Sequence, residues 1–541
     1  MWNRTYTLLL ACGVSLSFWG CSHKEKAVAD SLSLHERRTL LRGIGSSLDS
    51  LDPQRARTVE SQQVLRDLCE GLTTLDKTGA PAPGVASSWR VASDGTRYTF
   101  VLRPGARWSN GDRVVGADFV AGLRRLVDPA TASAYGQVVD VIVNASDIIA
   151  GRKQPSSLGV TSPDPGTVVI QLNSPSGYFL SLLSHPSTCP VHRPSLMRYG
   201  DRFMRPENMV SNGAFVLRGW VQNGFLTAAR NRFYWNNAAT RLDEVQFYPI
   251  GDENAELTRY RAGQLDITNT VPRGQYEWIR ENLRAELHVT PMLGTYFYGF
   301  DVRRPPFDNP DLRRALSLVI DRERLTKLVL RVGEVPAYGW VPPGVHNYES
   351  QSFDYQGTPL ADRVAEARRL YARAGYSRAR PLRVELVYNP GEVHTKLALA
   401  IVAAWKESLG AEVTLRMEDM KVLLYDIETG QVPLFRSSWN GDYNDAYSFL
   451  QFLKSDFGVN LPHYQSAEYD AALARGAQSV DDDSRKTEFE AAERIALGDH
   501  ALIPLYFYVS KHLVKPEVGG WYDNSMNVTY SKDLFIRVGV P

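Results

Sequence analysis

Residues 432–443 read VPLFRSSWNGDY and combine a strand pattern with groups suited to a charged ligand. The run 432–435 is apolar and aromatic enough for a buried strand, and the Asn-Gly-Asp after Trp439 is turn chemistry that ends it. Asp442 is therefore predicted at the end of a strand. A carboxylate there, shielded by Trp439 and Tyr443, can receive a ligand ammonium through charge-assisted hydrogen bonds, and the indole face adds cation–π attraction. The alternative is a surface turn with a packed Trp.

The composition is that of a globular protein with an excess of aromatic residues. A chain of 541 residues exceeds what one hydrophobic core usually supports, so two or three domains are expected. The net charge is +1, which argues against a nucleic-acid partner, because such a partner needs a basic face. The 26 Tyr, 20 Phe and 11 Trp suit either large cores or a cleft whose walls stack on a ligand, and core is the prediction for most of them.

Residues 1–20 have the pattern of an export signal. Arg4 supplies a positive start, and residues 5–20 carry no charge and end in a small residue before Cys21. This stretch is too short to span a bilayer permanently, and no other transmembrane candidate follows it. The sequence therefore predicts export to the periplasm or cell envelope.

Gly20-Cys21 resembles a bacterial lipobox, in which Cys21 would be lipidated, become the mature N-terminus and anchor the protein to a membrane. Phe18 and Trp19 depart from the usual lipobox residues, so a soluble exported form is the alternative. Residues 21–37 are polar and without pattern, as a tether between an anchor and a domain should be.

Two of the four cysteines lie in the signal region, which leaves Cys69 and Cys189 for the folded part. An oxidising compartment would allow a bridge between them. Their surroundings give no metal-ligand spacing, and we predict two separate buried thiols.

The first half of the chain mixes strand and helix patterns. From about 70 to 190, turn signals such as Asp94-Gly95 and Asn110-Gly111 separate alternating strands from an amphipathic helix, which suggests a subdomain of its own. The elements expected are strands at 40–51, 98–103 and 168–170, and helices at 61–72, 116–127 and 255–262.

The second half contains a predicted βαβ unit. It consists of a strand at 383–388, a helix at 393–409 closed by Gly410, and a strand at 412–417. An aromatic strand at 296–300 marks a lobe boundary. Further elements expected are a helix with Asn309 as its N-cap and Pro310 at its first position, a helix at 485–497 and a strand at 503–508.

Sequence motifs for catalysis are missing. There is no Gly-x-Ser-x-Gly elbow and no His-Glu-x-x-His pair, and Gly43-Ile44-Gly45 is too short for a phosphate or dinucleotide fingerprint. We expect no enzyme activity, no cofactor and no metal site. A hydrolase stays as an alternative, because triads are recognised by geometry and not by spacing.

An ordered series of short motifs resembles the oligopeptide-binding group of bacterial ABC-importer solute-binding proteins. The resemblance spans nearly the whole mature chain, and the order of thirteen motifs, each weak alone, makes it specific. They are Ser50-Leu51-Asp52-Pro53, Glu70-Gly71-Leu72, Pro83-Gly84-Val85-Ala86, Tyr98-Thr99-Phe100, Trp108-Ser109-Asn110-Gly111, Asp118-Phe119-Val120, Asp128-Pro129-Ala130-Thr131-Ala132-Ser133, Asn212-Gly213-Ala214, Arg259-Tyr260-Arg261-Ala262-Gly263, Pro305-Pro306-Phe307, Ala374-Gly375-Tyr376, Trp439-Asn440-Gly441-Asp442-Tyr443-Asn444 and Leu513-Val514-Lys515-Pro516.

The resemblance implies an α/β fold of the two-lobed periplasmic binding protein type, with a hinge of two crossing segments and an extra α+β subdomain in the first lobe. The first lobe would comprise 38–69, the subdomain 70–192, 193–293 and a return segment 510–541, and the second lobe 294–509. The implied function is that of a monomeric substrate-binding lipoprotein that closes on an extended oligopeptide and delivers it to an ABC permease. Backbone hydrogen bonds would hold such a peptide independently of its sequence.

The resemblance also assigns roles to residues. Asp442 would receive the peptide amino terminus, and Trp439 and Arg436 would line the pocket. Arg436 and His394 resemble groups that meet the carboxylates of peptides of different lengths. Val59 and Tyr135 fall where the first lobe contacts the ligand backbone. The remaining ligand-binding candidates are Met420 and Tyr508.

Some positions depart from enteric oligopeptide binders. Those proteins carry Trp in place of Met420, an acid in place of Arg57, Arg in place of Ile427, and a cysteine pair in place of Gly294 and Asn440. Peptide length and side-chain preference are therefore not transferable. The alternative function is the binding of another solute, such as a cell-wall peptide, an oligosaccharide or a nickel chelate.

Overall fold

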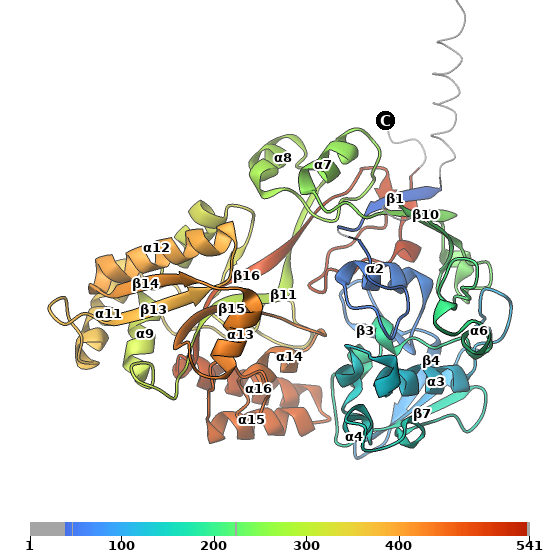
Figure 1. Cartoon of the computed structure of the whole chain (residues 1–541), viewed down its shortest axis with the longest axis horizontal. Coiled ribbons are helices and arrows are strands. Elements are labelled where there is room, and N and C mark those ends of the chain that lie inside the picture. The colour runs from blue at the N-terminus through green and yellow to red at the C-terminus, as the bar shows by residue number, and fades with distance from the viewer. Residues whose placement is uncertain (1–37, 46, 222–223, 538–541) are drawn as a thin grey trace, which may run out of the picture.

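The chain folds into two lobes connected by two long strands, β11 (Leu287–Phe300) and β16 (Leu502–Leu513) (Figure 1). The structure is a computed structural model that describes residues 38–45, 47–221 and 224–537, except for the side chains of Met420 and Lys421. The two strands pair antiparallel from one lobe to the other, with register shifts on both sides of Thr295 and Tyr296. This arrangement confirms the expected α/β fold with two crossing segments between the lobes.

The first lobe is built on a four-stranded sheet. Its strands, in spatial order, are β1 (Thr39–Gly43), β10 (Glu244–Tyr248), β9 (Leu226–Arg230) and β8 (Phe215–Trp220), with β1 parallel to β10 and the other pairs antiparallel. Its helices are α2 (Val59–Leu68), α6 (Arg193–Tyr199), α7 (Glu253–Arg261) and α8 (Tyr276–Asn282). The C-terminal segment returns here, where β17 (Val518–Gly519) pairs with β18 (Phe535–Ile536) and Leu534 joins the core of this lobe.

Two elements of this lobe differ from the prediction. Strand β1 ends at Gly43 and not at Leu51, because Gly45 takes a φ of 78° and the chain turns away from β10. Helix α2 starts at Val59, earlier than predicted, because the Thr58 hydroxyl accepts a hydrogen bond from Ser61 N–H and caps the helix.

The subdomain has an antiparallel sheet and its own hydrophobic core. The strands, in spatial order, are β4 (Ala86–Val91), β5 (Arg97–Leu102), β7 (Thr167–Gln171) and β6 (Val160–Thr161). Helices α3 (Gly116–Val127), α4 (Ala145–Ile149) and α5 (Phe179–Leu182) complete it, and β2 (Thr73–Leu75) pairs with β3 (Pro81–Pro83) beside it. Phe100, Phe119 and Phe179 are fully buried between the helices and the sheet.

Cys69 and Cys189 form a disulfide bond, so the prediction of two separate thiols is wrong. The two cysteines are 120 residues apart in sequence, and the contact that brings them together is not local. The Gln54 side-chain amide donates to the carbonyl oxygens of Ser187 and Cys189, at 3.1 Å each, and holds the second cysteine against the start of the first lobe.

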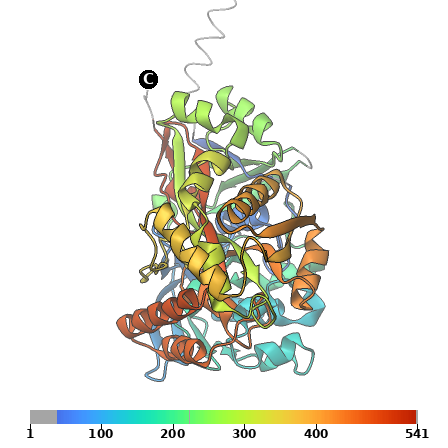
Figure 2. The ribbon, with the colours of Figure 1, turned by 90° about the vertical axis from the view of Figure 1, so that its left-hand side faces the viewer.

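The second lobe contains a six-stranded mixed sheet. In spatial order its strands are β12 (Val335–Pro336), β16, β11, β15 (Leu434–Asn440), β13 (Arg383–Tyr388) and β14 (Glu412–Met417). Helices flank this sheet, as Figure 2 shows from the side of this lobe: α9 (Pro310–Leu318), α10 (Arg322–Arg324), α11 (Leu360–Arg373), α12 (Glu392–Leu409), α13 (Met420–Glu428), α14 (Tyr447–Leu450), α15 (Ala467–Gln478) and α16 (Asp482–Gly498).

The predicted βαβ unit is confirmed. Strands β13 and β14 pair in parallel, and α12 connects them and is closed by Gly410 with a φ of 78°. Asn309 caps α9 with Pro310 at its first position, also as predicted. The strand expected at 296–300 is the end of the much longer β11.

The predicted export signal, the tether and Cys21 all lie outside the described residues. Within the part of the chain that the structure describes, no helix is both long and apolar enough to cross a membrane.

Candidate ligand-binding cleft

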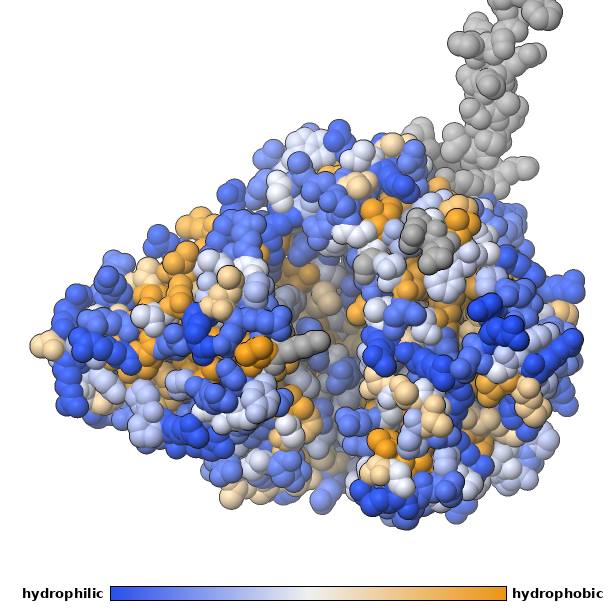
Figure 3. All heavy atoms as spheres, in the orientation of Figure 1, coloured by the Kyte–Doolittle hydropathy of each residue, from blue (hydrophilic) through white to orange (hydrophobic). Residues whose placement is uncertain are grey.

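A deep cleft separates the two lobes on the face shown in Figure 3. Strand β15 reaches it from the second lobe and ends at Asn440, as predicted. The Asp442 backbone N–H then donates to the Ser448 hydroxyl at 2.9 Å, and the Trp439 indole N–H donates to the Ser448 carbonyl at 2.6 Å. Ser448 therefore fixes both the aspartate and the indole that the sequence singled out.

The Asp442 carboxylate is open to solvent, but the surrounding walls remove enough water to raise its pKa above the usual value. Among the described side chains, none forms an ion pair with it. A ligand ammonium that bound here would supply the missing positive charge. Trp439 is half-buried and packs at 5.0 Å against Phe452, so its position is set before a ligand arrives.

Arg436, on the same strand, is a buried cation with 4% exposure. Its Nη1 donates to Asn389 Oδ1 at 2.8 Å, its Nη2 donates to the Tyr508 hydroxyl at 3.3 Å, and its guanidinium lies 4.4 Å from the centre of the Tyr296 ring. The Nε atom has no hydrogen-bond partner, and no described carboxylate pairs with this side chain. A buried charge without a counter-charge is costly, and an incoming anion would relieve that cost.

His394 lies on the first turn of α12, and its Nδ1 is 3.2 Å from the Tyr296 hydroxyl. Burial, and next the charge of Arg436, lower the pKa of His394 to about 4. The imidazole is therefore neutral at pH 7 and can exchange hydrogen bonds without adding charge. Tyr296 and Asn389 were not predicted as site residues, because only the fold brings them to Arg436.

The other candidates are placed as follows. Val59 is the first residue of α2, which lies on the side of the first lobe toward the second lobe in Figure 1, and its side chain is 75% exposed. The Tyr135 hydroxyl donates to the Arg57 carbonyl at 3.3 Å, and the ring lies 4.8 Å from that of His185. Tyr508 is half-buried beside Arg436. Met420 begins α13, but its side chain is outside the described part of the structure.

Comparison with known proteins assigns the family. Residues 80–460 match the family described as "Bacterial extracellular solute-binding proteins, family 5 Middle". The chain belongs to this family of solute-binding proteins. It is 36% identical to the periplasmic oligopeptide-binding protein OppA of Escherichia coli, over 99% of each chain. It is 39% identical to the probable deoxycholate-binding periplasmic protein YgiS of E. coli, over 90% of this chain and 91% of the other. The unliganded open form of the murein tripeptide-binding protein MppA of E. coli superposes with a TM-score of 0.87 at 35% identity, covering 93% of this chain and 98% of the other.

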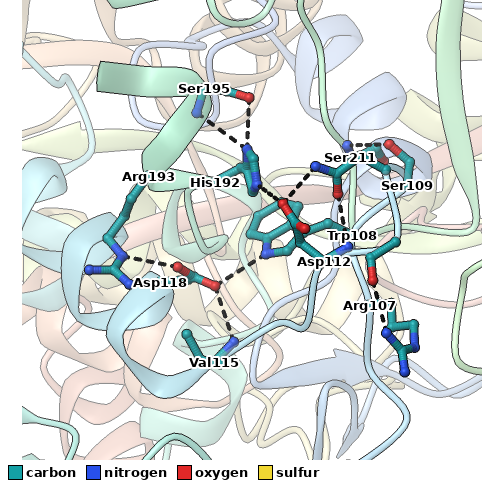
Figure 4. A network of polar contacts seen from close by, with 12 residues as sticks. Arg107, Trp108, Ser109, Asp112, Val115, Asp118, His192, Arg193, Ser195 and Ser211 are labelled. Atoms are coloured by element: carbon teal, nitrogen blue, oxygen red, sulfur yellow. Dashed lines mark hydrogen bonds and ion pairs between the residues drawn. The ribbon is translucent and has the colours of Figure 1, made fainter. Parts of the chain in front are cut away.

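Members of this solute-binding family are not enzymes, although a Ser–His–Asp arrangement lies where the subdomain meets α6 of the first lobe (Figure 4). His192 Nδ1 lies 2.7 Å from the Ser195 hydroxyl, and Nε2 lies 3.0 Å from Asp112 Oδ2. The Ser195 backbone N–H donates to the same Nδ1, so His192 is the N-cap of α6. Ser195 is buried and out of reach of a substrate.

The Trp108 motif that contributed to the resemblance is also structural. The Trp108 indole N–H, the Val115 backbone N–H and the Arg193 side chain all donate to the Asp118 carboxylate at 3.1 Å (Figure 4). In this solute-binding protein the network stabilises the start of α3 and joins it to α6. No group of three or more His, Cys, Asp or Glu side chains in the described ranges has the arrangement of a metal site.

Proposed function

We propose that the protein captures extended oligopeptides in the cleft and delivers them to the permease of an ABC importer. The observation that carries this proposal is a pair of opposite, unpaired charges on one strand and its loop. Asp442 offers a carboxylate and Arg436 a buried guanidinium, and neither has a described ionic partner. A peptide with free ends has the two complementary charges.

The spacing of these two groups suits a short peptide. They are six residues apart in sequence, so an extended backbone separates them by roughly 20 Å at most. An extended peptide spans about 3.3–3.6 Å per residue, and a ligand that pairs with both groups would therefore have about six residues or fewer. His394 and Tyr508 lie next to Arg436 and would meet the terminal carboxylates of peptides of other lengths. Val59 and Tyr135 would contact the peptide backbone from the first lobe.

Titration calorimetry on Asp442→Asn tests the proposal. The probes are tri-alanine, its N-acetylated form, murein tripeptide and deoxycholate, and Asp362→Asn, at an exposed position on α11, is the matched control. Removal of one partner of a desolvated charge pair costs roughly 2–5 kcal/mol, or about 30-fold to several thousand-fold in affinity. Wild type and the control should reject the acetylated peptide, and Asp442→Asn should discriminate much less.

Equal affinity of wild type for the free and the acetylated peptide would show that no amine is recognised. Preference for deoxycholate would favour the second candidate function, the binding of a non-peptide solute. This candidate is considered because the chain is 39% identical in sequence to a probable deoxycholate-binding protein. Mass spectrometry of whatever co-purifies with the protein would identify the natural ligand directly.

We also propose that export and lipidation of Cys21 hold the protein at the membrane beside its permease. The support is the sequence of residues 1–21, an uncharged stretch that ends in Gly20-Cys21. Cys21→Ala should move the protein from the membrane fraction to the soluble fraction. Intact-mass measurement of a mature chain with an unmodified N-terminus would contradict the anchor.

A further inference from the structure

The Asp442 carboxylate belongs to a loop that both lobes hold. The loop comprises residues 441–447. From the second lobe, Arg485 of α16 donates two hydrogen bonds to the Asp445 carboxylate, at 2.6 and 2.9 Å, in a buried ion pair. Also from that lobe, the His346 backbone N–H donates to the Asn444 side chain at 2.8 Å. The loop is thus fixed on one side by buried polar contacts.

The subdomain of the first lobe holds the other side. The ring of Tyr178, the residue before α5, lies 4.6 Å from the ring of Tyr443 and 5.1 Å from that of Tyr447, with interplanar angles of 13° and 10°. Tyr443 is 6% exposed and packs with the core of the subdomain, although it belongs to a segment of the second lobe. These contacts join the start of α14 to the residue before α5, and so cross from the second lobe to the subdomain.

Two further contacts show that this approach between the lobes is close. The Asn444 side-chain amide donates to the Gly79 carbonyl at 3.3 Å. Gly177 lies so near Arg485 that a Cβ at this position would be 2.6 Å from the guanidinium Nε. A side chain at position 177 would therefore collide with the guanidinium of the ion pair that holds Asp445.

We infer that Tyr178 is a positioning residue for ligand recognition by Asp442. This inference rests on the proposed function, in which Asp442 binds the peptide ammonium. Tyr443 follows Asp442 directly, so a ring that fixes Tyr443 from the opposite lobe also fixes the direction of the carboxylate. Pre-organisation of this kind strengthens binding because less freedom is lost when the ligand arrives. The subdomain thereby takes part in recognition without touching the ligand amine.

The test compares Tyr178→Ala with Tyr178→Phe by titration calorimetry, with tri-alanine and N-acetyl-tri-alanine as probes. The measured quantity is the ratio of the two affinities. Loss of this constraint on the loop predicts that Tyr178→Ala lowers this ratio by about tenfold, while Tyr178→Phe keeps the wild-type ratio because it keeps the stacking. Thermal unfolding of both variants checks that they are folded.

The outcomes separate the inference from the function on which it rests. Wild type that binds both probes equally would refute the role of Asp442 and, with it, the positioning role. Wild type that discriminates, together with Tyr178→Ala that discriminates equally well, would refute the positioning role alone. A loss of affinity by the same factor for both probes would show that Tyr178 only supports the fold. If Tyr178→Ala does not fold, Tyr178→Leu, which removes the ring but keeps much of the buried apolar volume, replaces it in the comparison.

Discussion

Replacement of Arg436 by Met should weaken the binding of peptides with a free carboxylate without destabilising the fold. The guanidinium is buried, has an unsatisfied Nε and lacks a described counter-charge, so the folded protein bears its desolvation cost in the absence of ligand. A methionine side chain can keep the contact with the Tyr296 ring. The free energy of unfolding of Arg436→Met should therefore equal or exceed that of wild type in urea titrations.

The affinity of Arg436→Met for peptides with a free carboxylate, in contrast, should fall. A buried charge pair that loses one partner costs roughly 2–5 kcal/mol, which corresponds to about 30-fold to several thousand-fold. Among oligoalanines of three to five residues, this loss should appear for the length whose carboxylate reaches Arg436 and disappear with the C-terminal amide of that peptide. The charge of Arg436 is also the second cause of the low pKa of His394, so that pKa should rise from about 4 towards its ordinary value of 6.5.

Three measurements check this reasoning: titration calorimetry with the acid and amide peptides, urea unfolding, and NMR titration of the His394 ring. Arg369→Met, at an exposed position on α11, is the control and should leave all three unchanged. The reasoning is refuted by an equal loss of affinity for the acid and amide peptides. A substantial loss of stability would likewise show that Arg436 supports the fold more than it serves a ligand.

Ligand binding should bring the lobes together, because each lobe carries part of the site, and small-angle scattering at saturating peptide should show a smaller radius of gyration; an unchanged radius would contradict closure. Cys69→Ser with Cys189→Ser should lower the free energy of unfolding by about 5 kcal/mol, as expected for the release of a loop of 120 residues, and a loss below about 1 kcal/mol in urea titrations would contradict that estimate. The pKa of His394 in the folded protein lies below its unfolded value, so its contribution to stability is lost as pH falls from about 6.5 to about 4. His394→Gln should therefore lose less stability over that range than wild type, and parallel pH profiles would contradict this.

Local signals in the sequence were sufficient to predict many of the helices and strands of the second lobe. The bounds of β13, α12 and β14 agree with the prediction to within one residue, because Gly410 stops the helix and the strand patterns on both sides are clear. The end of β15 was predicted for the same reason, since Asn-Gly-Asp is unambiguous turn chemistry. In contrast, residues 287–292 of β11 are only partly buried, lack a clear alternation and were not predicted.

Contacts between distant segments could not be predicted from local sequence patterns. The pairing of Cys69 with Cys189 depends on how the chain returns to the end of α2 after the subdomain, and no spacing encodes it. The surroundings of Arg436 come from two other strands and a turn, so its charge was predicted but its lack of an ionic partner was not. Tyr178 lies in a segment without any motif, and only its stack on Tyr443 and Tyr447 draws attention to it.

The disulfide has a consequence for the survival of the protein outside the cell. It joins the chain at the two points where the subdomain leaves and re-enters the first lobe, so the segment between them is a covalently closed ring. A protease that cuts once within this segment, for example at the exposed turn near Asp94, would open the ring without releasing a fragment. On a gel the nicked protein would run as a single chain until a reductant separated its two pieces. An extracellular protein with this topology can thus be damaged once in its subdomain and remain in one piece.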